Sequence, residues 1–64
     1  MKEYQERVCE EKTALDEKLD ALSAFLNKDD SPEVSSEELA RLERQQAIMA
    51  NYSAVLDERI SAFN

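Results

Sequence analysis

The segment Asn27-Lys28-Asp29-Asp30-Ser31-Pro32-Glu33-Val34 decides the fold, because helical patterning of the chain stops there. It gathers turn-forming residues around the only proline of a chain that has no glycine. Ser35 and Glu38 follow directly with capping-box spacing, and Val34 with Leu39 stand where a hydrophobic staple would lie. The segment therefore predicts a turn over about 28–35 and the start of a second helix.

Apolar residues recur at helical spacing on both sides of this turn. Val8, Leu15 and Leu22 fall seven apart before it and predict an amphipathic helix over about 2–27. After it, a helix over about 36–62 is predicted by the residues Leu42, Met49, Leu56 and Phe63, which also fall seven apart. Two such helices joined by a short connection predict an all-α antiparallel hairpin, a single domain over residues 1–64.

The second predicted helix carries more apolar surface than one partner helix covers, since Ile48, Tyr52 and Val55 widen its apolar face. With one cysteine and no histidine, a chain of 64 residues has neither a disulfide nor a zinc site to stabilise it. We therefore expect a homo-oligomeric helical bundle, simplest as a dimer of hairpins, with trimers or hexamers as alternatives. The predicted oligomer seam consists of Val8, Leu15, Leu22, Leu42, Met49, Tyr52, Leu56 and Phe63.

The charges of the chain limit its partners. A net charge of −7 argues against duplex nucleic acid and anionic membranes, which are held by lysine and arginine. No apolar run is long enough to span a membrane, and a lone cysteine favours a reducing compartment, so we expect a cytoplasmic protein. Opposite charges four residues apart, such as Lys12 with Asp16, predict solvated ion pairs on the outer face of the first helix. By the same spacing, Glu37 is expected to neutralise Arg41.

Signatures of catalysis are absent from the sequence. It has no histidine to act as a general base, no nucleophile elbow and no glycine-rich phosphate loop, so we expect no enzyme activity and no cofactor. The carboxylates Glu6 and Glu10 lie one turn apart but lack the histidine of di-metal bundles, so we expect no metal. Cys9 is expected to be an inert, partly buried thiol.

Tyrosine and arginine occur together near both ends of the chain, a combination that suits a nucleobase and its phosphate. Tyr4 with Arg7 begins the first helix, and Tyr52 with Arg59 lies toward the end of the second. An antiparallel hairpin would bring Tyr4, Arg7 and Arg59 toward one end. The alternative is that the tyrosines cover the ends of the core and the arginines neutralise nearby glutamates.

Two runs of sequence resemble known phage proteins. The first is Tyr4-Gln5-Glu6-Arg7-Val8, then Glu11-Lys12, followed by Leu15-Asp16-Glu17-Lys18-Leu19. The second is Leu42-x-x-Gln45-x-x-x-Met49-x-x-Tyr52-Ser53-x-Val55-Leu56-x-x-Arg59-Ile60. Together they resemble small helical-hairpin proteins of tailed phages and prophages, a family named after a crAss-like phage open reading frame. The run Met49-Ala50-Asn51 is also similar to the hairpins of phage proteins that sequester cyclic nucleotides made by bacterial immune systems.

These resemblances imply a non-enzymatic phage or prophage accessory protein. The second implies counter-defence by an oligomer that sequesters a cyclic nucleotide immune signal between subunits. Tyr4 would then stack on a base, with Arg7, Arg59 or Lys28 contacting phosphate. The alternative is an acidic protein–protein interaction module that binds and inhibits a host protein in the host cytoplasm. Both hypotheses describe binding without turnover.

Overall fold

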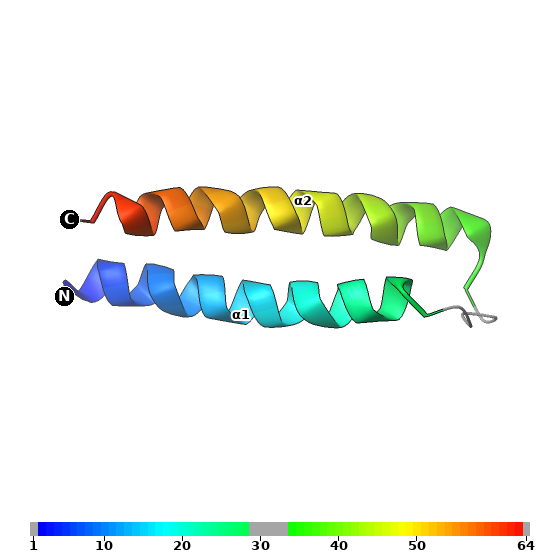
Figure 1. Ribbon diagram of the computed structural model, residues 1–64, viewed down its shortest axis with the longest axis horizontal. Coiled ribbons are helices and arrows are strands. Elements are labelled where there is room, and N and C mark those ends of the chain that lie inside the picture. Colours follow the sequence, from blue (N-terminus) through cyan, green and yellow to red (C-terminus); the bar gives the residue numbers. More distant parts are fainter. Residues whose placement is uncertain (1, 29–33, 64) are drawn as a thin grey trace.

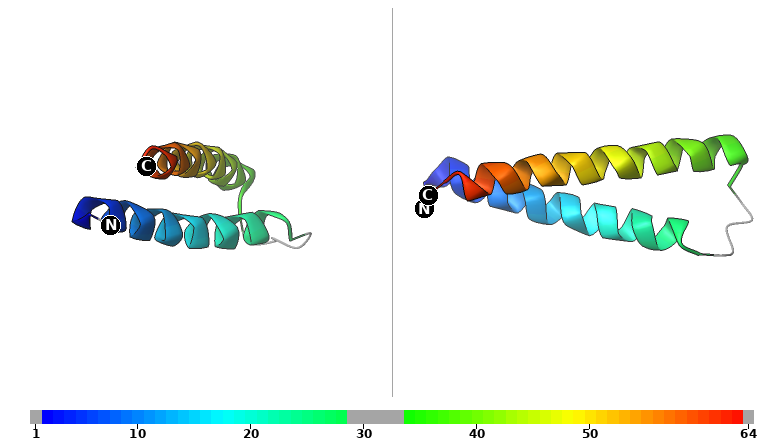
Figure 2. Two further views of the ribbon diagram at one scale, coloured as in Figure 1. Left: turned by 60° about the vertical axis from the view of Figure 1, so that its left-hand side comes forward. Right: turned by 45° about the horizontal axis from the view of Figure 1, so that its top comes forward.

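The protein is a two-helix antiparallel hairpin. The computed structural model describes residues 2–28 and 34–63, in which α1 spans Glu3–Leu26 and α2 spans Ser36–Ser61 (Figure 1). Cα extents of 46 × 14 × 14 Å make it a narrow rod, and the helices lie side by side in every view (Figure 2). The predicted all-α hairpin is confirmed. Most of the predicted turn, residues 29–33, lies outside the described residues.

Helix α2 begins at the predicted cap. The Ser35 side chain accepts a hydrogen bond from the Glu38 backbone N–H at 3.1 Å, which satisfies one of the free donors of the first turn. The reciprocal half of the predicted capping box is not formed, because the Glu38 carboxylate accepts a hydrogen bond from Arg41 Nε at 2.8 Å. Arg41 is therefore paired with Glu38 one turn away, and the predicted pairing with Glu37 is wrong.

The side chains sheltered from solvent follow alternating three- and four-residue steps along both helices. In α2 and the turn after it, the sheltered positions are Leu39, Leu42, Gln46, Met49, Ser53, Leu56, Ile60 and Phe63. In α1 they include Gln5, Val8, Lys12, Leu15, Leu19, Leu22 and Leu26. Such 3,4 spacing is the packing pattern of paired, slightly supercoiled helices. We call the line along which these positions meet the hairpin seam.

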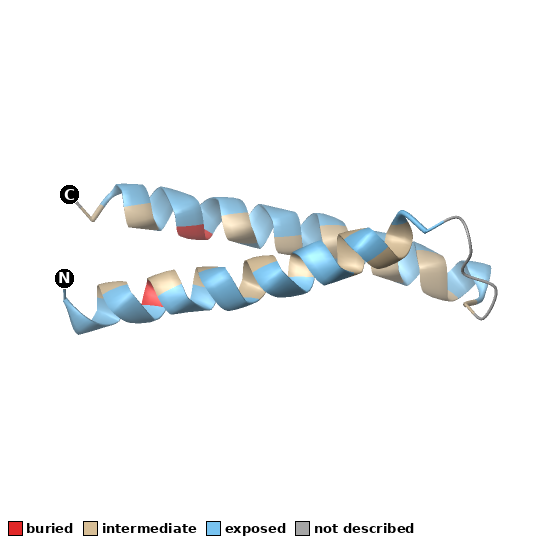
Figure 3. Cartoon of the chain, turned by 60° about the horizontal axis from the view of Figure 1, so that its bottom comes forward, coloured by how far each residue is buried: buried red, intermediate tan, exposed pale blue. Residues whose placement is uncertain are grey.

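The hairpin seam is narrow, and little of it is closed off from water. Val8 is 5% exposed and Leu56 is fully buried, and these are the buried residues of the described chain. The other seam positions keep intermediate exposure, and the outer faces of both helices are open to solvent (Figure 3). Two helices enclose no interior, so the seam alone forms the core. Neither helix is apolar enough over its length to cross a membrane.

The two ends of the described chain meet at one end of the rod. The rings of Tyr4 and Phe63 pack edge to face, with centroids 5.8 Å apart and planes at 82°. This contact joins the first turn of α1 to the residues that follow α2. Both chain ends lie at the left of Figure 1. We call this end of the rod the terminal end of the hairpin.

Candidate functional site

Tyr4 and Arg7 lie on one face of the first two turns of α1, at the terminal end. Tyr4 remains 48% exposed beside Phe63, so part of its ring surface is available for stacking. Arg7 Nη1 lies 3.7 Å from Glu3 Oε1, and both side chains are largely exposed. An exposed ion pair of this length is weak, so most of the guanidinium donors stay accessible to an anion.

The other two proposed ligand residues lie at different places in the hairpin. Arg59 is exposed in the last turn of α2, at the same end of the rod as Tyr4. Lys28 follows α1 at the opposite end, about 36 Å from Tyr4 at 1.5 Å of helix rise per residue. One chain therefore brings Tyr4, Arg7 and Arg59 to one end but keeps Lys28 apart from them.

The residues proposed for an oligomer seam divide into two groups. Seven of them lie in the hairpin seam of a single chain: Val8, Leu15, Leu22, Leu42, Met49, Leu56 and Phe63. Tyr52 is different, because it is 43% exposed on the outer side of α2 with Ile48 and Val55. A contact between copies would therefore use the residues beside Tyr52, since the other seven already pack within the hairpin.

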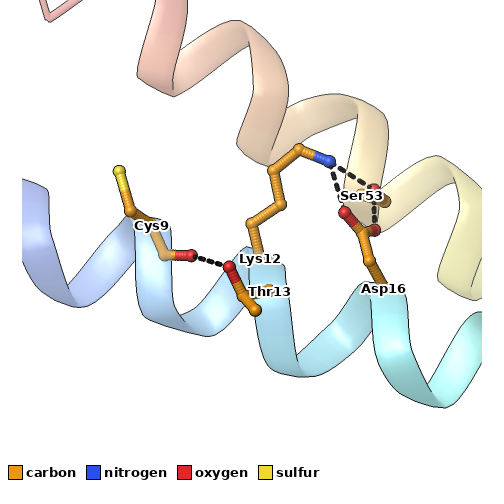
Figure 4. Close-up of polar contacts among 5 residues, drawn as sticks. All are labelled: Cys9, Lys12, Thr13, Asp16 and Ser53. Carbon is orange, nitrogen blue, oxygen red and sulfur yellow. Dashed lines mark hydrogen bonds and ion pairs between the residues drawn. The ribbon is translucent and has the colours of Figure 1, made fainter.

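A polar network joins the two helices near the middle of the rod (Figure 4). Lys12 Nζ donates to Asp16 Oδ2 at 2.7 Å and to Ser53 Oγ of α2 at 3.0 Å. The Ser53 hydroxyl donates to Asp16 Oδ1 at 2.5 Å. Lys12 and Asp16 were predicted to form a solvated pair on the outer face, but they lie at the helix interface, where Ser53 completes their hydrogen bonding.

A second polar contact crosses the helices on the loop side of this network. Gln46 Nε2 of α2 donates to Ser23 Oγ of α1 at 2.9 Å. Extension of the three- and four-residue steps from Leu42, Met49 and Leu56 would have placed Gln46 and Ser53 in the seam. Both are polar, so the seam predicted from the apolar residues does not include them. Together the two polar contacts fix how α1 and α2 are aligned.

The network makes hairpin stability depend on pH. Hydrogen bonds donated by Lys12, and then by Ser53, hold the pKa of Asp16 below its ordinary value of 3.8. Because the pKa of Asp16 is lower in the folded protein, the ionised carboxylate stabilises the hairpin above pH 3.8. That stabilisation is lost as the pH falls through the folded pKa. We expect Asp16→Asn to lose less stability than the parent protein between about pH 7 and pH 3. Urea unfolding followed by circular dichroism at both pH values measures this, and equal losses would contradict it.

The described residues enclose no cavity, and they hold no group of three His, Cys, Asp or Glu side chains placed to bind a metal ion. Cys9 is half-buried on α1, and its carbonyl accepts a hydrogen bond from Thr13 Oγ1 at 3.0 Å (Figure 4). The groups available for binding are therefore surface groups: exposed tyrosines and arginines at the terminal end and on the outer side of α2.

Comparison with known proteins identifies the family. The Sequestin family model matches residues 2–62, which is nearly the whole hairpin. The search of the curated proteins found no match, and neither did the search of the solved structures. The match confirms the resemblance to hairpin proteins that sequester, and a sequestering family is one that binds its target rather than converting it. The chain belongs to the Sequestin family.

Proposed function

We propose that this protein is a phage or prophage counter-defence protein that sequesters a cyclic nucleotide immune signal, as a homo-oligomer and without chemical turnover. The observation that carries the proposal is the Sequestin match over residues 2–62. The geometry supports it at the terminal end, where Tyr4 and Arg7 share an exposed face.

These two side chains suit the two parts of a nucleotide. An exposed tyrosine ring offers a surface on which a base stacks, at about 1–3 kcal/mol per base in single-strand binding proteins. A guanidinium binds two phosphate oxygens at once. The ion pair of Arg7 with Glu3 is long, and a phosphate group would replace it. An acidic chain can bind such a ligand, because a few arginines set the local potential.

Lys28 tests whether the ligand lies between chains. It is remote from Tyr4 and Arg7 within one hairpin, so it can contact the same ligand only as part of a second copy. If Lys28→Ala and Arg7→Ala both weaken binding, the bound nucleotide touches two chains. If only Arg7→Ala does so, the terminal end of a single hairpin is sufficient.

The test is a native mass spectrum of the protein with a panel of cyclic di- and trinucleotides, followed by calorimetry on any nucleotide that binds. We expect a defined ligand mass on an oligomer, and at least about a tenfold loss of affinity in Arg7→Ala, as for removal of one charge-assisted contact. Tyr4→Ala should weaken binding while Tyr4→Phe, which keeps the ring, retains it. Lys18→Ala is the matched control, because Lys18 is an exposed cation of α1 away from the terminal end.

Failure of the proposal has a clear form. If no nucleotide of the panel adds mass, sequestration of these signals is refuted, and the alternative of a host protein partner becomes the next hypothesis. If a nucleotide binds but Arg7→Ala and Tyr4→Ala leave its affinity unchanged, the function stands and the terminal site is wrong.

A further inference from the structure

Helix α2 carries a second packing line besides the hairpin seam. Its members step along the helix by four, three, four, three and four residues: Arg41, Gln45, Ile48, Tyr52, Val55 and Arg59. All six are exposed, and Ile48 and Val55 are 61% and 51% exposed. Such spacing is the pattern of a helix that packs against another helix. We call this surface the outer α2 face.

The outer α2 face is distinct in charge as well as in pattern. The chain carries a net charge of −7, yet all the basic residues of α2, which are Arg41, Arg44 and Arg59, lie on this face or along its edge. No carboxylate occupies its six positions. Along one edge, Arg44, Asn51 and Glu58 follow at intervals of seven residues, all exposed. The edge is therefore positive at one end, neutral in the middle and negative at the other.

We infer that a second copy of the chain covers the outer α2 face, with the two α2 helices antiparallel about a two-fold axis that passes between Ile48 and Tyr52. This inference rests on the homo-oligomer of the proposed function and names its contact surface. The axis places Ile48 opposite the partner's Tyr52, and Gln45 opposite the partner's Val55. The apolar residues of both copies thus meet at the centre, as an isologous interface requires.

Charge complementarity along the edge of the interface favours this arrangement, and Arg41 and the partner's Arg59 are the like charges that it brings together. Along the edge, where the pairing centres one residue further on, at Asn51, Arg44 lies nearest the partner's Glu58 and Glu58 nearest the partner's Arg44, with the two Asn51 side chains between them. Within one chain Arg44 and Glu58 are fourteen residues apart, about 21 Å along the helix, so they cannot pair with each other. Neither takes part in an ion pair among the described residues. A parallel arrangement would place like charges together at both ends.

The amount of exposed surface agrees with a missing partner. A folded monomer of 7.3 kDa is expected to expose about 4,200 Å². This chain exposes 4963 Å², about 800 Å² more than that expectation. The rod shape of the hairpin contributes to this excess, and a standard interface, which removes about 800 Å² from each partner, is large enough to cover it.

The pairing also completes a basic site that one chain lacks. Arg59 of the partner lies opposite Arg41, next to Arg44, so each end of the interface gathers three guanidinium groups from two chains. Glu38 and the partner's Glu58 neutralise only two of them. Phosphate groups of a small anionic ligand would bind at these two symmetric ends, since arginine pairs with phosphate oxygens.

The decisive experiment is a charge reversal followed by sedimentation velocity without nucleotide. Arg44→Glu and Glu58→Arg each place like charges across the axis, and each should weaken dimerisation at least about tenfold. The double variant Arg44→Glu/Glu58→Arg restores opposite charges and should recover the parent dimer. Ile48→Asp should yield monomer, whereas Ala54→Asp, which adds the same charge at an exposed position off the outer α2 face, should not.

A crosslink tests the axis directly. In a Cys9→Ser background, Asn51→Cys should oxidise to a covalent dimer, and Ala54→Cys should not.

Monomeric parent protein, or a double charge reversal that fails to recover the dimer, overturns the inference. Nucleotide binding measured on the same variants is a separate readout: a dimer without binding leaves the inference standing and removes the proposed function. Nucleotide binding by a monomer overturns the inference and leaves sequestration standing without the oligomer. Occupation of this face by a host protein overturns the inference and favours the alternative function.

Discussion

Leu56→Asp is expected to unfold the hairpin. Leu56 is the one described residue with no exposed surface, and it lies in the hairpin seam beside α1. Loss of a buried leucine costs about 2–5 kcal/mol, and an unpaired carboxylate at the same place adds its desolvation cost. A domain of 64 residues has about 3–10 kcal/mol of stability in total. The sum of the two costs exceeds what so narrow a seam supplies.

Circular dichroism at 222 nm measures this loss of helix. The control is Ala54→Asp, because Ala54 is exposed two residues earlier in the same helix and receives the same charge. We expect the control to keep the parent spectrum and Leu56→Asp to show that of an unfolded chain. A helical Leu56→Asp variant with the parent melting temperature would refute the seam.

Gln46→Leu is expected to stabilise the hairpin by about 1–2 kcal/mol, since it adds a half-buried apolar side chain to the seam. Gln46 occupies a seam position and bonds across to Ser23. The lost hydrogen bond costs less than the leucine contributes, because Ser23 is only half-buried and water replaces its partner. Urea unfolding measures the change, and a destabilised Gln46→Leu variant would contradict it.

The same substitution should make the helix alignment less specific. Polar seam residues fix register because a slipped arrangement leaves them unpaired. Lys12 with Ser53 and Ser23 with Gln46 are the two places where α1 and α2 exchange hydrogen bonds among the described residues. Amide NMR spectra of Gln46→Leu are therefore expected to show extra or broadened resonances in both helices. Ser36→Ala, an exposed change at the start of α2, serves as the control.

Most of the fold could be predicted from the sequence because the apolar period is a direct signal. Val8, Leu15 and Leu22, and Leu42, Met49 and Leu56 in the second half, are spaced for two helices, and Ser35 marks where the second begins. The polar network was missed because lysine, aspartate and serine look the same in a sequence whether they face water or another helix. Only the spacing of the apolar residues around such a polar residue shows whether it faces water or the other helix.

The candidate site was less predictable for a different physical reason. Tyr4, Arg7 and Arg59 reach one end because antiparallel helices bring those positions together, which the sequence pattern does indicate. Lys28 lies at the other end because it follows α1, and Tyr52 faces outward because Met49, Ser53 and Leu56 occupy the seam. Whether a second copy brings either residue to the ligand depends on the assembly. A pattern of residues within one chain does not specify the geometry of a neighbouring copy.

The edge-to-face contact of Tyr4 with Phe63 affects how the protein can be handled. Any polypeptide joined before Glu3 or after Phe63 leaves the rod at the end that carries Tyr4 and Arg7 (Figure 1). An affinity tag on either side would therefore crowd the proposed nucleotide contacts. A fluorophore or surface attachment is better placed at an exposed position near the middle of α1, such as Glu17. The inferred dimer puts the two terminal ends at opposite ends of the assembly, so a single-chain tandem needs a linker from Phe63 that spans the length of the rod.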